Sequence, residues 1–450
     1  MAAARHRQND GPVRGTIPHQ EAGVLPCNTP QIPADSTPTA TPIAVVGTLI
    51  MVYVMSQFFR NSLGVIGPDL AKEFQLEAAH LSMLGSAFFL SFALVQIPLG
   101  MAIDRFGARV CLLTPTLILL AGTLLFAFAR NFSDLVLARL IIGLGCSSFL
   151  MAPLAIYAER FPPQMFGTMV GIHVGTGNLG SLGATAPLAF VTAWLGWRSG
   201  FLIIAALVAI AIVLVYFVVH DDEAARTRRK LRAESFASLL RGVAAAAKTD
   251  SFWPVFIMQL ATYPAFAAIL GLWSGPWLSQ TYGLGLEERG NLLFAMALAQ
   301  ICSLFAWGTV DRIFKSYKIP CLLGASLCVL VLALAALLPI PRSLLLPYLI
   351  LLGLVFGFSP VLTSHGKSLF PPELTGRGLS LLNIAAMGGV FVQQLATGAI
   401  ISLFETRLVN GVHVYPPEAY RWVFGILAAE IALAMLLYTR TRDPHPAKAH

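Results

Sequence analysis

Apolar segments of about 20 residues alternate with short polar segments along most of this chain. A helix needs about 20 predominantly apolar residues to cross a lipid bilayer, and twelve segments meet that requirement. They are 43–66, 80–101, 110–129, 135–157, 167–194, 199–219, 252–280, 287–308, 319–338, 344–368, 374–404 and 418–438. The pattern therefore predicts an all-α membrane protein with twelve transmembrane helices.

The polar segments divide the apolar ones into two groups of six. Residues 220–250 form the long internal hydrophilic segment, so we expect six-helix bundles at 43–219 and 251–438 joined by a central loop. Residues 1–42 contain seven prolines and no apolar run, which is typical of a disordered tail. Residues 439–450 form a second polar tail.

Composition and charge agree with a membrane protein and give its orientation. Hydrophobic residues make up 56% of the chain and charged residues 12%, against about 25% charged residues in soluble proteins. With the N-terminus inside, 21 Lys and Arg fall in inner segments and 7 in outer loops. Because basic residues favour the cytoplasmic side, both tails and the central loop are expected in the cytoplasm, and the protein in the plasma membrane, the inner membrane of a bacterium. The same asymmetry explains the net charge of +8 without a nucleic-acid partner.

Motifs of enzymes, metal sites and cofactor sites are absent from the sequence. It contains no HExxH, no P-loop, no G-x-S-x-G and no CxxC pair. We therefore expect no catalytic residues, no metal and no cofactor. The expected partners are lipid and a small-molecule substrate, and any pumping must use a gradient, including that of a co-transported proton or ion.

A short charged turn joins the second and third predicted helices. Its glycines and charged residues are Gly100, Asp104, Arg105, Gly107 and Arg109. Two helices joined by so few residues must be antiparallel neighbours, so this turn lies at the membrane surface.

Two short motifs of the first half recur in the second half, both shifted by nearly the same number of residues. Asp104-Arg105 recurs 207 residues later as Asp311-Arg312, and the Phe-Pro-Pro at 161–163 recurs 209 residues later at 370–372. The offsets predict an internal repeat, an arrangement that secondary transporters use.

These motifs resemble those of the major facilitator superfamily. Gly100-x-x-x-Asp104-Arg105-x-Gly107-x-Arg109 resembles that family's signature loop, and Arg139-x-x-x-Gly143-x-Gly145 resembles its second motif. The second-half copy departs from the pattern, with Trp307 in place of Gly100 and Phe314 in place of Gly107. The resemblance implies two pseudo-symmetric six-helix bundles, alternating access, and a cavity lined by helices 1, 4, 7 and 10.

The first helix is similar to that of organic-anion carriers, which include anion:cation symporters and organophosphate exchangers. The similar stretch is Tyr53-x-x-x-x-Phe58-Phe59-Arg60-Asn61 followed by Pro68-Asp69, and it implies that Arg60 is an anion ligand. In the symporters an acid tied to proton coupling stands where this chain has Cys146, which argues against proton symport. The stretch 177–180 also resembles nitrate carriers, but their substrate arginines in spans two and eight are absent here, so we favour an organic anion over nitrate.

Three residues are the candidates for substrate binding. Arg60 and Arg139 enter their helices to comparable depth, and two guanidinium groups facing one cavity would suit a carboxylate or phosphate. Alternatively both arginines extend to the headgroups, or Arg139 mainly holds helices together. Tyr263 lies near the middle of the seventh helix beside a proline, either as a cavity ligand or as a packing residue.

Four further residues are candidates for ion coupling, each with a structural alternative. Glu430 lies in the twelfth helix and Asp69 just past the first, where it could instead cap or gate. His173 and His365 could relay a proton, because histidine titrates near neutrality. A histidine among apolar residues is more often a hydrogen-bonded core group, and His365 could also line an inner gate with Lys367.

The charged turns have a mechanical interpretation. Asp104, Arg105 and Arg109, with Asp311 and Arg312 in the second half, could latch the inner face closed; alternatively the turns only set topology. We predict a secondary transporter of a small organic anion. The alternatives are a drug or metabolite efflux carrier, and a transporter-like sensor that binds without transport.

Overall fold

The computed structural model describes residues 42–220, 236–371, 373–409 and 412–444. The predicted disordered tail, apart from Pro42, lies outside the described residues, as do residues 221–235 of the predicted central loop and the last six residues. Part of the predicted central loop is helical, since α10 covers Phe236–Ala247.

The first half of the chain is helical from Pro42 onward. Its helices are α1 (Pro42–Phe74), α2 (Ala78–Phe106), α3 (Ala108–Ala127), α4 (Phe132–Cys146), α5 (Met151–Arg160), α6 (Pro163–Gly177), α7 (Leu179–Gly183) and α8 (Ala186–Val218).

The second half is helical except for one small hairpin. Its elements are α11 (Phe252–Ala268), the π-helix η1 (Ile269–Trp273), α12 (Ser274–Tyr282), α13 (Leu286–Trp307), α14 (Val310–Phe314), α15 (Lys318–Leu337), η2 (Arg342–Leu344), α16 (Leu345–Val355), η3 (Phe356–Phe358), α17 (Ser359–Ser368), α18 (Thr375–Ile401), β1 (Arg407–Val409), β2 (Val412–Val414) and α19 (Pro417–Tyr438).

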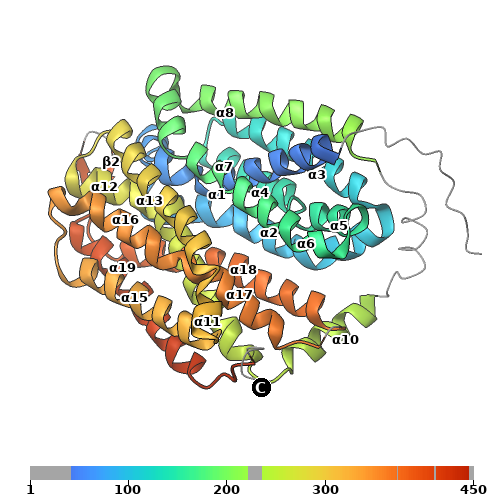
Figure 1. The fold of residues 1–450 in the computed structure, drawn as a ribbon. Coiled ribbons are helices and arrows are strands. Elements are labelled where there is room, and N and C mark those ends of the chain that lie inside the picture. Colours follow the sequence, from blue (N-terminus) through green and yellow to red (C-terminus); the bar gives the residue numbers. More distant parts are fainter. Residues whose placement is uncertain (1–41, 221–235, 372, 410–411, 445–450) are drawn as a thin grey trace, which may run out of the picture. The chain divides into compact units, whose positions relative to one another are not determined.

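Twelve membrane crossings follow from these helices. Eleven helical runs of the described residues are long and apolar enough to span a bilayer. The run Gln164–Val218 has 55 residues, about 80 Å if straight at ~1.5 Å per residue, far more than the ~30 Å bilayer core. It reverses at Gly196, whose φ of +80° suits glycine, and Figure 1 shows the α8 ribbon turning back on itself. This one run therefore supplies two crossings, which confirms the predicted twelve-helix fold.

The turn between α2 and α3 is tighter than predicted. Gly107 alone separates the two helices, with a φ of +88°, so Asp104 and Arg105 belong to the last turn of α2 and Arg109 to the first turn of α3. A residue with a Cβ would be strained at this φ. The glycine of the motif is thus required by the backbone.

Helix α1 is longer than its predicted span of 43–66. It continues through Pro68 and Asp69 to Phe74, so the expectation that Asp69 lies beyond the helix is wrong. Pro68 has no N–H to bond the carbonyl of Gly64 one turn earlier, and α12 packs against that carbonyl at Gly275, where a side chain would collide with it. The proline does not end the helix, and the other half covers the carbonyl that lacks its helical hydrogen bond.

The two halves meet along three pairs of membrane spans, with η1 and α12 belonging to the same span. Helix α2 packs on α18, α1 on η1 and α12, and α8 on α13. Small residues permit this approach: a Cβ on Gly398 would collide with Ser82, and one on Gly85 would lie 2.6 Å from the Gln394 Oε1 atom. Close approach at small residues is typical of helices in membranes, where lipid gives no hydrophobic drive for helix association.

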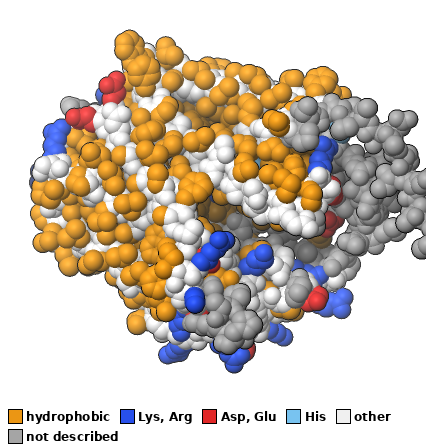
Figure 2. All heavy atoms as spheres, in the orientation of Figure 1, with side chains coloured by type: hydrophobic (Ala, Val, Ile, Leu, Met, Phe, Trp, Pro, Cys, Tyr) orange, Lys and Arg blue, Asp and Glu red, His pale blue; other side chains and the backbone are white. Residues whose placement is uncertain are grey.

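The molecular surface separates apolar from charged side chains. Figure 2 shows hydrophobic side chains covering most of the visible face, with Lys, Arg, Asp and Glu gathered in a few places. Large apolar residues on helices α8 and α15 are among the most exposed, including Phe217 and Leu330. Such a surface belongs in contact with lipid.

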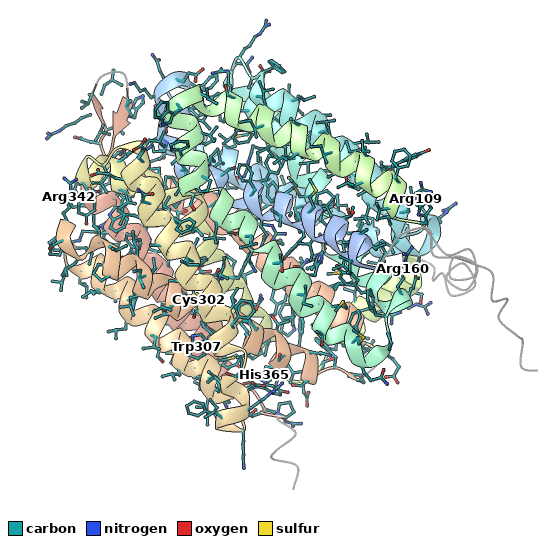
Figure 3. All side chains as sticks on the ribbon, turned by 45° about the horizontal axis from the view of Figure 1, so that its top comes forward. Arg109, Arg160, Cys302, Trp307, Arg342 and His365 are labelled. Carbon is teal, nitrogen blue, oxygen red and sulfur yellow. The ribbon has the colours of Figure 1, made fainter. Side chains whose placement is uncertain are left out.

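The segment between α18 and α19 was not predicted. It forms an antiparallel hairpin in which Arg407 pairs with Val414 and Val409 with Val412. We call the end of the molecule that carries this hairpin the hairpin end, and the opposite end, which carries Gly107, the turn end. In Figure 3, Arg109 and Arg160 lie at the turn end and Arg342 at the hairpin end.

Candidate functional site

Arg60 lies deep inside the bundle. It is 14 residues from the end of α1 at Phe74, about 21 Å of helix, rather than the six residues that the shorter predicted span implied. Its side chain is 7% exposed. The guanidinium donates from Nη1 to the Tyr263 hydroxyl of α11 at 3.3 Å and lies 4.7 Å from the ring centroid of Phe92. These contacts direct Arg60 into the bundle rather than toward headgroups.

The charge of Arg60 is not balanced by an acid. Among the described residues, no Asp or Glu forms an ion pair with it, and its buried Nε atom has no hydrogen-bond partner. By contrast, Arg198 pairs with Glu73 and Arg289 with Asp69. A buried charge without a countercharge costs several kcal/mol, so the position of Arg60 lowers the stability of the fold unless something else compensates for it.

Arg139 has a different environment from Arg60, although the sequence made both residues candidates for substrate binding. It is 1% exposed and lies over the Phe88 ring at 5.0 Å. Its Nη1 donates to the Phe59 carbonyl at 2.8 Å and its Nε to the Leu84 carbonyl at 3.3 Å. Arg139 thus joins α4 to α1 and α2, which favours the helix-holding interpretation over a ligand role.

The helices around Arg60 are interrupted at its depth. The fourth span breaks between α4 and α5, next to Cys146, and the fifth breaks at Asn178 between α6 and α7. The seventh contains the π-helix η1 five residues after Pro264. Interrupted helices in membranes are tolerated where they line a cavity or are buried in protein, and π-helical turns often mark functional sites.

Polar side chains tie α1 to the broken fifth span. Gln57 donates to the Asn178 side chain at 2.8 Å, and Asn61 donates to the Ser181 hydroxyl at 2.9 Å. These bonds fix the rotation of α1 about its axis and hence the direction of Arg60.

Two aromatic neighbours of Arg60 were not among the predicted site residues. Phe92 comes from α2, and Tyr53 precedes Arg60 by seven residues on α1. A spacing of seven places two residues on the same helix face, so the spacing already signalled Tyr53. Phe92 had no such signal, because only the fold brings α2 to Arg60.

Both candidate histidines are buried and fully hydrogen-bonded. The Nδ1 atom of His173 lies 3.0 Å from the Tyr157 hydroxyl, and the Nδ1 atom of His365 lies 2.6 Å from the Tyr438 hydroxyl. Each Nε2 faces a backbone carbonyl, at 3.2 Å for His173 and 2.9 Å for His365. A carbonyl only accepts, so Nε2 carries the hydrogen and the neutral ring is satisfied at both nitrogens. This geometry favours the core interpretation over a proton relay.

Glu430 contacts a polar partner in the second half. Its Oε2 accepts from the Gln393 side chain at 2.7 Å, and Gln393 also donates to the Ala261 carbonyl. This bond joins α19 to α18, and the second bond of Gln393 joins α18 to α11. Such a bond suits the structural alternative, in which the carboxyl group links helices.

The charged turns are held within their own halves by the contacts described. Arg109 donates to the Tyr216 carbonyl of α8 at 2.7 Å and lies over its ring, while Arg105 lies over Phe106. The second turn differs, because Asp311 and Arg312 belong to the short helix α14, which is followed by Lys315 with a φ of +47°. The latch role of both turns stays a prediction.

Asp69 and Arg289 join the two halves at the hairpin end. The Asp69 carboxylate of α1 and the Arg289 guanidinium of α13 are 3.1 Å apart, with Arg289 buried and Asp69 partly exposed. The hairpin adds a second bridge, since the Tyr415 hydroxyl accepts from the Ala78 amide at 3.1 Å and Glu77 lies 3.9 Å from His413. These contacts favour the gating alternative for Asp69 over ion coupling, and both stay predictions.

Breaking the Asp69–Arg289 pair is expected to open the hairpin end. Asp69→Ala leaves the buried Arg289 charge unpaired. We expect this to destabilise the state closed at the hairpin end, relative to the open state, by about 1–3 kcal/mol, which shifts the equilibrium between the two states roughly 5- to 150-fold. Labelling of Ala71→Cys by a membrane-impermeant maleimide, in a background without native cysteines, measures the opening.

The charge-swapped protein, with Asp69→Arg and Arg289→Asp together, is the matched control. It should restore slow labelling, while Asp69→Asn should give an intermediate rate. Equal labelling rates in wild type and Asp69→Ala would show that this pair does not hold the end closed.

A multi-pass helical bundle with broken helices around a buried, unbalanced cation defines a solute carrier of the membrane. The chain belongs to the Major Facilitator Superfamily, whose sequence model matches residues 49–394.

Curated relatives include several anion transporters. A gentisate transporter of Corynebacterium glutamicum is 28% identical over 353 residues, 74% of this chain and 76% of that protein. A nitrate/nitrite transporter of Picosynechococcus is 28% identical, but the match spans only 42% of this chain and 40% of the relative. A probable sulfoacetate transporter of Cupriavidus necator is 25% identical over 60% of this chain and 65% of that protein. The relatives are transporters rather than enzymes.

Solved structures share the fold at low sequence identity. A bacterial homologue of the human lysosomal transporter Spinster, in an inward-facing and unoccupied conformation, has a TM-score of 0.72 at 17% identity and covers 89% of this chain and 97% of its own. A D-xylose–proton symporter has a TM-score of 0.67 at 14% identity, covering 89% and 98%. The likeness extends over almost the whole chain of each.

Proposed function

We propose that this protein is a secondary transporter of a small organic anion and that Arg60 holds the charge of that anion. The supporting observation is the unbalanced guanidinium of Arg60, buried near the middle of α1 with a free Nε donor. Tyr263 is proposed as a second contact, from the other half of the molecule. A site shared between the halves is suited to alternating access.

The chemistry of relatives supports an anion. Gentisate, sulfoacetate and nitrate are all anions, and these are the solutes in the names of the relatives above. Among the described residues no acid pairs with Arg60. Together with Cys146 at the fourth span, this supports exchange or facilitated transport over proton symport. Arg139 is proposed as a positioning residue that anchors α1.

The proposed movement is a rocking of residues 43–219 against residues 251–438. In the proposed orientation the turn end faces the cytoplasm of a bacterial cell, as the distribution of Lys and Arg suggests. The Asp69–Arg289 pair and the 407–414 hairpin support a state closed at the hairpin end. The charged turns would separate when that end opens.

Transport of matched carboxylates and amides tests the proposal. We expect proteoliposomes with this protein to take up labelled gentisate or benzoate, and the corresponding amides at least 100-fold more slowly, because an amide leaves the Arg60 charge unbalanced. Uptake is compared with protein-free vesicles.

The same assay separates the alternatives. Binding of the carboxylate without uptake would identify a sensor, and equal uptake of carboxylate and amide would favour efflux of uncharged compounds.

A further inference from the structure

We infer that Tyr53 is a second substrate-contacting residue and that His173 and Tyr157 position it. The inference rests on the proposed function, because it assigns further residues to the same anion site. It also narrows the substrate to an oxyanion with two acceptor oxygens, such as a carboxylate, since Arg60 and Tyr53 each offer a donor.

Tyr53 and Arg60 share one face of α1. They are separated by seven residues, two turns of the helix, and long side chains on a helix point back toward its N-terminus. The side chain of Arg60 therefore extends toward Tyr53, and its Nη1 atom lies 3.3 Å from the Tyr263 hydroxyl. Within the described part of the chain, the Tyr53 hydroxyl makes no hydrogen bond, so it is available to a ligand.

The ring of Tyr53 is held in place on two sides. The His173 ring stacks on it with centroids 4.8 Å apart and planes 28° apart. On α6, Gly177 lies so close that a Cβ there would collide with the Tyr53 Cδ1 atom. The ring cannot swing toward α6, and its hydroxyl direction is fixed.

His173 is itself immobile. Its two nitrogens are engaged by the Tyr157 hydroxyl and the Phe149 carbonyl, and both rings are fully buried. His173 touches Tyr53 but not Arg60 in the contacts described. The role inferred for the His173–Tyr157 pair is therefore to preorganise a ligand donor, which raises affinity by lowering the entropy lost on binding.

The environment of Arg60 and Tyr53 favours a flat anion. Phe92 covers one face of the guanidinium at 4.7 Å, and the Tyr53 ring stands two turns away. A planar carboxylate could accept from Arg60 Nε and from the Tyr53 hydroxyl while its body packs against aromatic rings.

Binding of gentisate to purified variants tests the inference. We expect Tyr53→Phe to raise the dissociation constant at least tenfold, as loss of a hydrogen bond to a charged group does. We expect His173→Ala to raise it about fivefold in the wild-type background and to have no further effect in Tyr53→Phe. His173→Phe, which keeps a stacking ring, should recover most of the loss.

His365→Ala is the matched control. His365 is equally buried, with a tyrosine and a carbonyl as partners, but it lies in the other half, away from Arg60. It should lower thermal stability about as much as His173→Ala and leave gentisate affinity unchanged.

The outcomes separate this inference from the proposed function. If the wild type binds none of acetate, benzoate and gentisate, or Arg60→Met binds them equally well, the proposed function fails and the inference with it. If Arg60→Met loses binding but Tyr53→Phe does not, only the role of Tyr53 is overturned. If His173→Ala weakens binding equally in both backgrounds, His173 does not act through Tyr53.

Discussion

Replacement of Arg60 by methionine is expected to abolish anion binding without destabilising the protein. Loss of the Arg60 charge removes about 3 kcal/mol or more of binding energy, a decrease in affinity above 100-fold. Methionine keeps much of the apolar stem and its contact with Phe92 while removing an unpaired charge, so the ligand-free variant should melt at the same temperature as wild type or a few degrees higher.

Thermal unfolding with and without gentisate measures both effects at once. The wild type should be stabilised by the ligand, and Arg60→Met should not. Arg60→Lys keeps the charge but loses the planar fork, and should retain weak binding. A ligand-free Arg60→Met that melts well below wild type would show that Arg60 is a structural residue.

The fold could be predicted from sequence because its determinants are local. Length and hydropathy identify each crossing, and the glycine at 107 marks a turn that the backbone requires. The errors arose where tertiary packing overrides a local signal. The first span was predicted to end at residue 66, but α1 continues through Pro68, and the Gly64 carbonyl packs against Gly275 of the other half. The hairpin is a different case, because the sequence does carry a local signal for it: Asn-Gly at 410–411 lies between β-branched residues.

The candidate site was only partly accessible from sequence. Arg60 and Arg139 are equivalent by hydropathy and depth, because both are arginines in apolar helices. The two arginines differ in whether carbonyl oxygens of other helices lie within hydrogen-bonding distance of the guanidinium group. This depends on how α1, α2 and α4 cross. The same limit applies to His173 and His365, whose tyrosine partners come from other helices of the bundle.

One physical principle separates the two arginines: a buried cation is either satisfied by the fold or left for a ligand. Arg139 has two carbonyl partners and Arg60 has one neutral hydroxyl. A protein that retains an unsatisfied cation gives up stability, and proteins tolerate such a loss mainly at functional sites. The stability of each arginine variant should therefore report its role.

Replacement of Arg139 by methionine is accordingly expected to have the opposite effect of Arg60→Met. It removes two charge-assisted hydrogen bonds from Arg139 of α4 to the carbonyls of Phe59 and Leu84, each worth about 1.5–3 kcal/mol. Part of this loss is offset, because burying an apolar side chain costs less free energy than burying a charge. A net loss of about 2 kcal/mol should reduce the yield of folded protein and lower its melting temperature by several degrees.

The folded fraction of Arg139→Met should still bind gentisate with a dissociation constant within about threefold of wild type, because Arg139 contacts α1 through the Phe59 carbonyl and not the ligand. Size-exclusion chromatography isolates that fraction, and calorimetry measures its affinity. Loss of affinity in a well-folded Arg139→Met would place both guanidinium groups on the anion. Retained affinity with reduced stability would leave the charge recognition to Arg60 alone.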